Sequence, residues 1–116
     1  MKKYGAKKDA NHKEIFDVLQ KLIPTKDLSA AGFGVPDGIG WVNGGWHLFD
    51  VKNPNSGYGR RGLNNRQKEW INNWNGGHVY LLYNVDDALN FAKGDFLKLK
   101  RFPEWPDDSK LLLAIN

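Results

Sequence analysis

The stretch Trp46-His47-Leu48-Phe49-Asp50-Val51-Lys52 decides how this chain folds, because it carries aromatic and β-branched residues of the kind that favour a sheet strand. Side chains alternate between the two faces of a strand, and one face here carries Trp46, Leu48, Asp50 and Lys52. The intervening residues, His47, Phe49 and Val51, occupy the other face. A carboxylate and an ammonium are therefore expected side by side on one face of a sheet.

A second strand is predicted over 37–42, and the glycine-marked turn Asn43-Gly44-Gly45 joins it to the first as a hairpin. Because a hairpin places its strands side by side, it sets the aspartate of Pro36-Asp37 close to Asp50. Two carboxylates then converge beside Lys52. Such a group can hold a hard divalent cation and place it near a reacting phosphate.

Before the hairpin, the spacing of the apolar residues predicts a helix. The first helix is predicted over about 11–23, and Pro24 ends it. Its apolar positions follow the i, i+3, i+4, i+7 rule at Ile15, Val18, Leu19 and Leu22. Asn11 and Glu14 fit a capping box at the start of this helix.

The remaining predicted elements are a short strand within 25–31, a helix from Asn64 or Asn65 to about Trp74, a buried strand over 78–83 and a short helix capped by Asn84. The resulting order, α-β-β-β-α-β-α, predicts a mixed α/β (α+β) sheet flanked by helices. The 116 residues are expected to form a single domain, with a core over about 9–91 and a C-terminal extension over 94–116. Within the extension, 111–115 reads as a late strand or an oligomer contact.

Composition narrows the class of protein. Hydrophobic residues make up 41% and charged residues 26% of the chain, which is typical of a globular domain. No run approaches the ~18 apolar residues of a membrane span, and the start, Met1-Lys2-Lys3-Tyr4-Gly5, lacks the apolar stretch of a signal peptide. The absence of cysteine excludes disulfides and cysteine-ligated zinc. These features predict a cytoplasmic protein with no membrane partner.

The net charge of +4 suits a nucleic-acid partner, although ordinary solubilising charge explains it equally well. Basic residues gather in three clusters: Lys2, Lys3, Lys7 and Lys8; Arg60, Arg61 and Arg66; Lys98, Lys100 and Arg101. Each cluster can contact phosphates, and each alone is also typical of a solvated face. The turn-rich loop over 53–63 adds Tyr58 beside Arg60 and Arg61, and we interpret it as a DNA clamp rather than an inert polar loop.

Taken in order, these motifs resemble the PD-(D/E)xK nuclease superfamily and, within it, the small VRR-NUC-type nucleases of bacteria and phages. The matching pieces are Asp9-Ala10-Asn11, Glu14-Ile15, Gly34-Val35-Pro36-Asp37, Asp50-Val51-Lys52, Gln67 with Trp70, and Val85-Asp86-Asp87-Ala88-Leu89. The resemblance implies a restriction-endonuclease-like αβββαβ core in a bacterial or phage-infected cell. It also implies hydrolysis of DNA phosphodiesters with Mg²⁺ or Mn²⁺ and no small-molecule organic cofactor. Relatives act on junctions, flaps or ordinary duplexes.

The resemblance also implies a role for each site residue. Asp37 and Asp50 would be metal ligands, together with the backbone carbonyl of Val51, and Lys52 would be the catalytic lysine. Glu14 would be the acid that the first helix directs to the metal, and Gln67 the glutamine of the second helix near the lysine. Position 50 departs mildly from the pattern, since close relatives mostly carry Glu there. The DNA contacts expected on charge and position are Tyr58, Arg60, Arg61, Arg66, Lys7 and Lys8.

Structural readings compete with these roles. Asp37 fits a turn aspartate, Asp50 and Lys52 fit a cross-strand ion pair, and Gln67 fits a surface position of its helix. The tryptophans at 70 and 74 are expected in the core, those at 41 and 46 in a structural pair across the hairpin, and the histidines at 12, 47 and 78 in structural roles.

Competing functions are a nucleic-acid-binding module without catalysis and a protein-interaction domain with incidental charges. Cleavage of a junction would need paired sites and so a homodimer. The tail could supply that contact through Phe102, Trp105 and 111–113.

Overall fold

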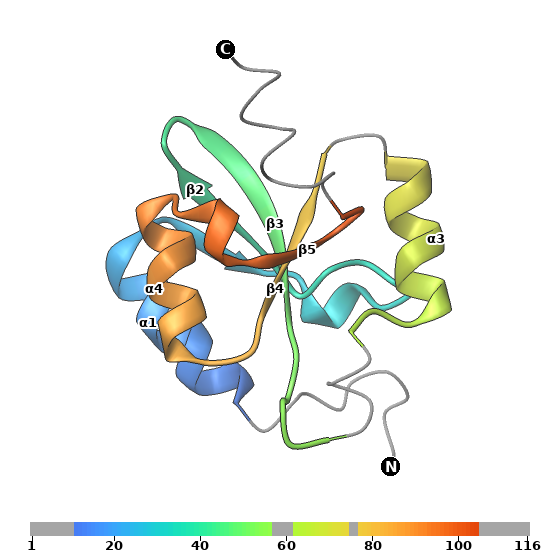
Figure 1. Cartoon of the computed structure of the whole chain (residues 1–116), viewed down its shortest axis with the longest axis horizontal. Helices are drawn as coiled ribbons and strands as arrows, with labels where there is room; N and C mark the ends of the chain where they lie inside the picture. Colours follow the sequence, from blue (N-terminus) through green and yellow to red (C-terminus); the bar gives the residue numbers. More distant parts are fainter. Residues whose placement is uncertain (1–10, 57–61, 75–76, 105–116) are drawn as a thin grey trace.

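A five-stranded mixed sheet forms the centre of the protein, with helices on both of its faces (Figure 1). The computed structural model describes residues 11–56, 62–74 and 77–104. Its elements are α1 (His12–Leu22), β1 (Thr25–Asp27), the 3₁₀ turn η1 (Ser29–Ala31), β2 (Gly38–Val42), β3 (Gly45–Val51), α3 (Asn65–Trp74), β4 (Val79–Leu82), α4 (Val85–Lys93), the 3₁₀ turn η2 (Phe96–Lys98) and β5 (Lys100–Phe102). The predicted order of helices and strands is confirmed, and a fifth strand follows it.

The strands lie in the order β1-β2-β3-β4-β5, and every neighbouring pair is antiparallel except β3 and β4. Parallel strands need a crossover connection, and α3 lies in the segment that makes it. This crossover places α3 on one face of the sheet, whereas α1 and α4 cover the other face (Figure 1).

The β2–β3 hairpin has a two-residue turn whose geometry sets the register. Asn43 and Gly44 both have positive φ, 49° and 81°, which is the type I′ turn that suits the twist of paired strands. Val42 then pairs with Gly45, and Gly38 pairs with Phe49. This register brings the residue just before β2, Asp37, beside the end of β3.

Two hydrophobic clusters confirm the predicted alternation along β3. Phe49 and Val51 are buried among α1 and α4, against residues such as Leu19 and Phe91. Leu48 faces the other way and packs with Ile71 of α3. Asp50 and Lys52 belong to the α3 face, so the site residues of β3 lie on the side that the crossover helix partly covers.

The start of α1 differs from its prediction. Asn11 makes no side-chain capping bond, and its Nδ2 donates instead to the carbonyls of Lys52 (3.0 Å) and Tyr83 (2.7 Å). The buried stripe of α1 is His12, Ile15, Phe16 and Leu19, whereas Leu22 is 54% exposed. The predicted capping box is therefore wrong, because Asn11 bridges the ends of two strands rather than capping its helix. The cap predicted at Asn84 is confirmed, since its Oδ1 accepts from Asp87 N–H at 2.8 Å.

The strand β5 was missed by the sequence patterns. It pairs antiparallel with β4, and Phe102 packs against the cluster under α3. Phe102 thus contributes to packing within the chain, and the predicted oligomer contact stays a prediction, since residues 105 and 111–115 lie outside the described part. Within the described residues, no helix is both long and apolar enough to cross a membrane.

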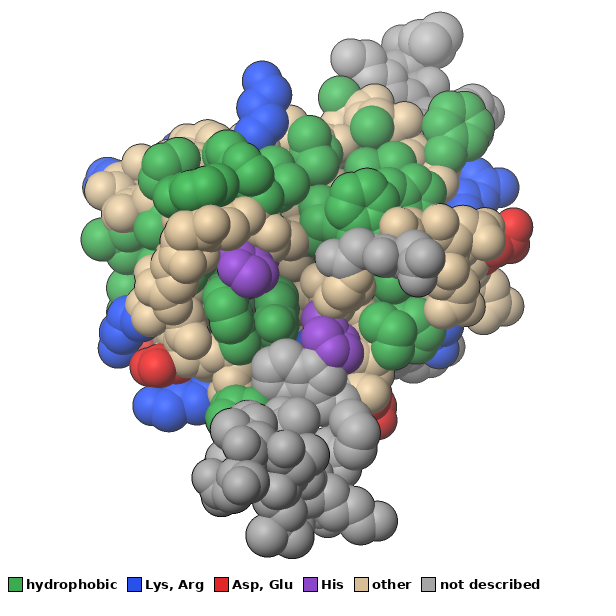
Figure 2. All heavy atoms as spheres, turned by 90° about the horizontal axis from the view of Figure 1, so that it is seen from above, with side chains coloured by type: hydrophobic (Ala, Val, Ile, Leu, Met, Phe, Trp, Pro, Cys, Tyr) green, Lys and Arg blue, Asp and Glu red, His purple; other side chains and the backbone are tan. Residues whose placement is uncertain are grey.

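Three of the tryptophans are more exposed than a core position implies. Trp41 and Trp46 pair edge to face across the hairpin at 5.2 Å between ring centroids and are 40% and 54% exposed. Trp74 is 44% exposed and stacks on Trp70, so its predicted core position is wrong. Hydrophobic side chains gather in patches on the face drawn in Figure 2.

Substituting Gly38 with alanine tests the packing that holds Asp37 in place. An added Cβ would lie 2.4 Å from Phe49 and 2.8 Å from Phe16, so we expect Gly38→Ala to lower the free energy of unfolding by about 1–3 kcal/mol in urea titrations. Gly45→Ala is the matched control, because its Cβ would meet nothing closer than 3.5 Å. An equal loss in both variants would contradict this account.

Candidate active site

Asp37 and Asp50 are interlocked through the main chain. The N–H of Asp37 donates to Asp50 Oδ1 at 3.0 Å, and the N–H of Val51 donates to Asp37 Oδ2 at 2.9 Å. Asp50 is almost fully buried, at 1% exposure, whereas Asp37 is only partly buried. The predicted convergence of the two carboxylates is confirmed, and solvent can reach the pair from the side of Asp37.

Lys52 and Gln67 complete the group on the same face of the sheet. Lys52 Nζ lies 2.9 Å from Asp50 Oδ2 and donates to Gln67 Oε1 at 3.0 Å. Gln67 Nε2 in turn donates to Asp50 Oδ2 at 3.1 Å. The three side chains therefore form a closed triangle of contacts, and Gln67 is not a plain surface residue of its helix.

The position of Gln67 is set by the first turn of α3. Its N–H donates to Asn64 Oδ1 at 2.9 Å, and its Oε1 accepts from the N–H of Asn64 at 3.0 Å. This reciprocal pair is a capping box, with Gln in the place of the usual third-position acid. One side chain thus caps α3 and contacts the acid–lysine pair, which ties the start of the crossover helix to the site.

The electrostatics of the pair differ between its two members. Burial and the adjacent charge of Asp50 raise the pKa of Asp37 to about 8, against an opposing hydrogen bond from Val51 N–H and the charge of Lys52. Burial and a second carboxylate at close range both make ionisation costly, so Asp37 keeps its proton to a higher pH than a free aspartate does. A divalent cation in place of that proton would relieve the same repulsion.

The donor set fits a hard divalent cation. The group contains two carboxylates, and among the described residues Lys52 is the cation that forms an ion pair with it, through Asp50. In that part of the chain no three His, Cys, Asp or Glu side chains form a metal-binding group. An ion here would therefore take further ligands from backbone, water or phosphate oxygen. Mg²⁺ suits such a site, since it is usually held by one or two carboxylates and keeps several waters.

Glu14 is not brought to the pair. It lies on the exposed side of α1, because the buried stripe of that helix faces the sheet, and α1 covers the face opposite to α3. Its predicted place among the metal ligands has no support from this arrangement. Arg66 is exposed on the first turn of α3, and Lys7, Lys8, Tyr58, Arg60 and Arg61 lie outside the described residues.

The histidines are also apart from the pair, in line with structural roles. His12 is buried, stacks on Phe16 and bonds to Asp27 at 3.1 Å. His47 packs on Phe96, with 4.6 Å between their ring centroids.

One neighbour of the site was missed from sequence. Tyr83 follows β4 and lies beside Lys52, as the shared contacts of Asn11 with both carbonyls show. Burial and the charges of Asp87 and Asp50 raise the pKa of its hydroxyl. The alternation of the strand over 78–83 places 79, 81 and 83 on one face, but only the parallel pairing with β3 reveals that this is the face of Asp50.

Comparisons of the chain with protein-family models, curated proteins and solved structures found no match. The chemistry of the site is therefore inferred from its residues and their geometry.

The raised pKa of Asp37 predicts how stability depends on pH. Between the unfolded-state value of 3.8 and the folded value of about 8, the folded protein holds a proton that the unfolded chain releases, so stability falls as pH rises. We expect Asp37→Asn, which keeps the shape and removes the charge, to stabilise the metal-free protein by on the order of 2–4 kcal/mol near pH 8 and much less near pH 4.

Urea unfolding at both pH values, without divalent ions, measures this difference. Asp17→Asn serves as the control, because Asp17 is an exposed acid of α1 paired with Lys13. A gain for Asp37→Asn that does not grow with pH would contradict the raised pKa of Asp37.

Proposed function

We propose that this chain is a divalent-metal-dependent endodeoxyribonuclease that hydrolyses DNA phosphodiester bonds. The observation that carries the proposal is the interlocked pair Asp37 and Asp50, with Lys52 and Gln67 in contact with Asp50 on the same face of the sheet. This set combines hard oxygen ligands with a fixed ammonium, which is what cleavage of an anionic ester requires. The net charge of +4 supports a polyanionic substrate.

Asp37 and Asp50 would hold the cation, and the carbonyl of Val51 would join them. When bound, Mg²⁺ or Mn²⁺ would polarise the phosphate, lower the pKa of a bound water and offset the charge of the leaving oxygen. The protein's own contribution is to keep the two carboxylates in one orientation, through the N–H groups of Asp37 and Val51.

Lys52 contributes a positioned positive charge. An ammonium has three N–H donors, and here the contacts with Asp50 and Gln67 use two of them. The third is available to a phosphate oxygen or to the attacking water. Orientation of that water, its deprotonation and stabilisation of the developing charge all remain compatible with this geometry.

Gln67 acts as a positioning residue in this proposal. It bridges Asp50 and Lys52 and keeps the carboxylate and the ammonium at a constant separation. Because the same side chain closes the capping box of α3, its rotamer is restrained from both sides. Because Gln67 is restrained in this way, the charged groups it holds do not have to move when charge develops during the reaction.

Structure-specific DNA, such as junctions or flaps, is the substrate class we propose within this activity. The test incubates the protein with labelled junction, flap, single-stranded and linear duplex DNA, each with Mg²⁺, with Mn²⁺ and with a chelator. Cleavage only in the presence of a divalent ion is the expected result.

Asp50→Asn should reduce metal-dependent cleavage by at least about a hundredfold, because the side chain keeps its size but no longer neutralises the cation. Asp17→Asn is the matched control, since it makes the same change at an exposed position of α1. Far-UV circular dichroism checks the fold of both variants.

Two outcomes would count against the nuclease. Equal cleavage by parent and Asp50→Asn would show that the site is elsewhere. Binding of DNA without cleavage under any divalent ion would instead favour a catalytically inactive nucleic-acid-binding module of the same fold.

A further inference from the structure

A row of residues crosses three strands from Asp50 to Lys100. Asp50 of β3 pairs with Leu81 of β4, and Leu81 pairs with Lys100 of β5. Residues paired across neighbouring strands point to the same face of a sheet. Lys100 therefore lies on the face of the acid pair, two strands away, which is about 10 Å at the usual strand spacing.

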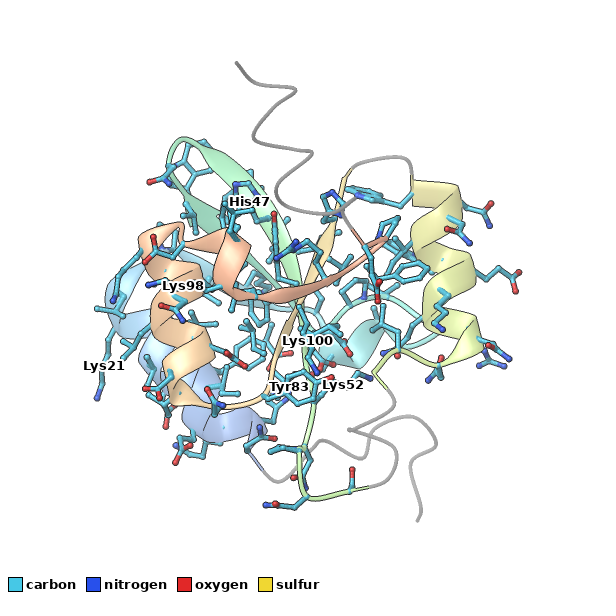
Figure 3. All side chains as sticks on the ribbon, viewed as in Figure 1. Lys21, His47, Lys52, Tyr83, Lys98 and Lys100 are labelled. Carbon is cyan, nitrogen blue, oxygen red and sulfur yellow. The ribbon has the colours of Figure 1, made fainter. Side chains whose placement is uncertain are left out.

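Tyr83 fills the space between this lysine and the site. Lys100 Nζ lies over the ring of Tyr83, 5.4 Å from its centroid, in a cation–π contact. On its other side Tyr83 neighbours Lys52, since the backbone ladder of β3 and β4 continues through Lys52 N–H and the carbonyl of Leu82. Figure 3 shows Lys52, Tyr83 and Lys100 gathered at one end of the sheet.

Lys100 differs in placement from the basic residues next to it in sequence. Arg101 points to the opposite face, and its guanidinium donates to the carbonyls of Phe96 and Leu97 at 3.1 Å. Lys98 lies in η2 and pairs loosely with Asp95 at 3.8 Å. Of the three residues in this basic cluster, Lys100 is the one that the sheet directs toward the acid pair.

The charge of Lys100 is available to a ligand. Its side chain is exposed, and no described carboxylate lies within ion-pair distance of its Nζ. The nearby Asp87 accepts from the N–H of Tyr83 at 2.9 Å, and the charge of Lys100 opposes the rise of its pKa that burial causes, so the two side chains interact without forming an ion pair. A lysine that contacts a ring and has no described carboxylate at ion-pair distance can bind an anion.

We propose that Lys100, held against the ring of Tyr83, binds a DNA phosphate next to the one at the acid pair. This site rests on the proposed nuclease function and deepens it by naming a second contact with the substrate strand. The two strand positions are about 10 Å apart, so side chains from both can reach neighbouring phosphates of one DNA strand. Lys100 is a positioning residue here, since it touches a flanking phosphate and not the reacting atoms.

The first test measures DNA binding without any cleavage. A fluorescein-labelled duplex is titrated with protein in a chelator at several salt concentrations. We expect Lys100→Gln to weaken binding severalfold and to lower the slope of log K against log salt by about 0.9, because one phosphate contact is lost. Lys21→Gln is the matched control, since Lys21 is exposed on α1, on the far side of the molecule (Figure 3).

The role of the ring is tested separately. Tyr83→Phe keeps the aromatic face and should bind like the parent, whereas Tyr83→Leu removes that face and should resemble Lys100→Gln. In cleavage assays Lys100→Gln should raise KM with little change in kcat, since a flanking contact binds ground state and transition state alike.

Failure of this inference is distinguishable from failure of the nuclease. Lys100→Gln with the affinity and salt slope of Lys21→Gln would overturn the phosphate site, even if the parent cleaves DNA. A parent that binds DNA without cutting it would overturn the nuclease, while the salt slope would still decide for or against Lys100. Thermal unfolding of each variant checks that the substitution leaves the fold intact.

Discussion

The site depends on two hydrogen bonds that cross between the strands of one hairpin. Asp50 accepts from the N–H of Asp37, and Asp37 accepts from the N–H of Val51. Two carboxylates placed this closely repel each other, and burial together with this repulsion raises the pKa of Asp37. They stay together because the turn at Asn43-Gly44 sets the register and because Gly38 leaves room for the ring of Phe49. The hairpin thus holds two carboxylates close together, and a bound cation would reduce the repulsion between them.

The crossover helix is coupled to this pair through a single side chain. Gln67 bonds to Asn64 at the start of α3 and to both Asp50 and Lys52. A parallel pair of strands requires some crossover, but it does not require that the crossover reach the site. Here the capping of α3 and the orientation of the acid–lysine pair use the same amide, so the stability of the helix and the order of the site are linked.

Charge is distributed unevenly along the face of the sheet. The carboxylates of Asp37 and Asp50 lie at β2 and β3, with the ammonium of Lys52 against Asp50, whereas Lys100 lies on β5, beyond Tyr83. A polyanionic strand laid across this face would meet the acid pair with Lys52 at one end and Lys100 further along. The arrangement comes from pairing registers, because each strand contributes one or two polar residues to a shared face.

The amino-acid sequence alone determined those features that depend on residues close together along the chain. Alternation along 46–52, the Asn-Gly turn and the proline after α1 were sufficient to predict the hairpin, the first helix and the meeting of Asp37, Asp50 and Lys52. Tertiary structure decided the rest. Asn11 bridges two strands rather than capping α1, and Glu14 faces solvent instead of joining the group in which Gln67 lies beside Lys52 as expected. The strand β5, and with it the place of Lys100 in the row of Asp50, follows from pairing between strands that are far apart in sequence, and no short-range pattern encodes which strands will meet.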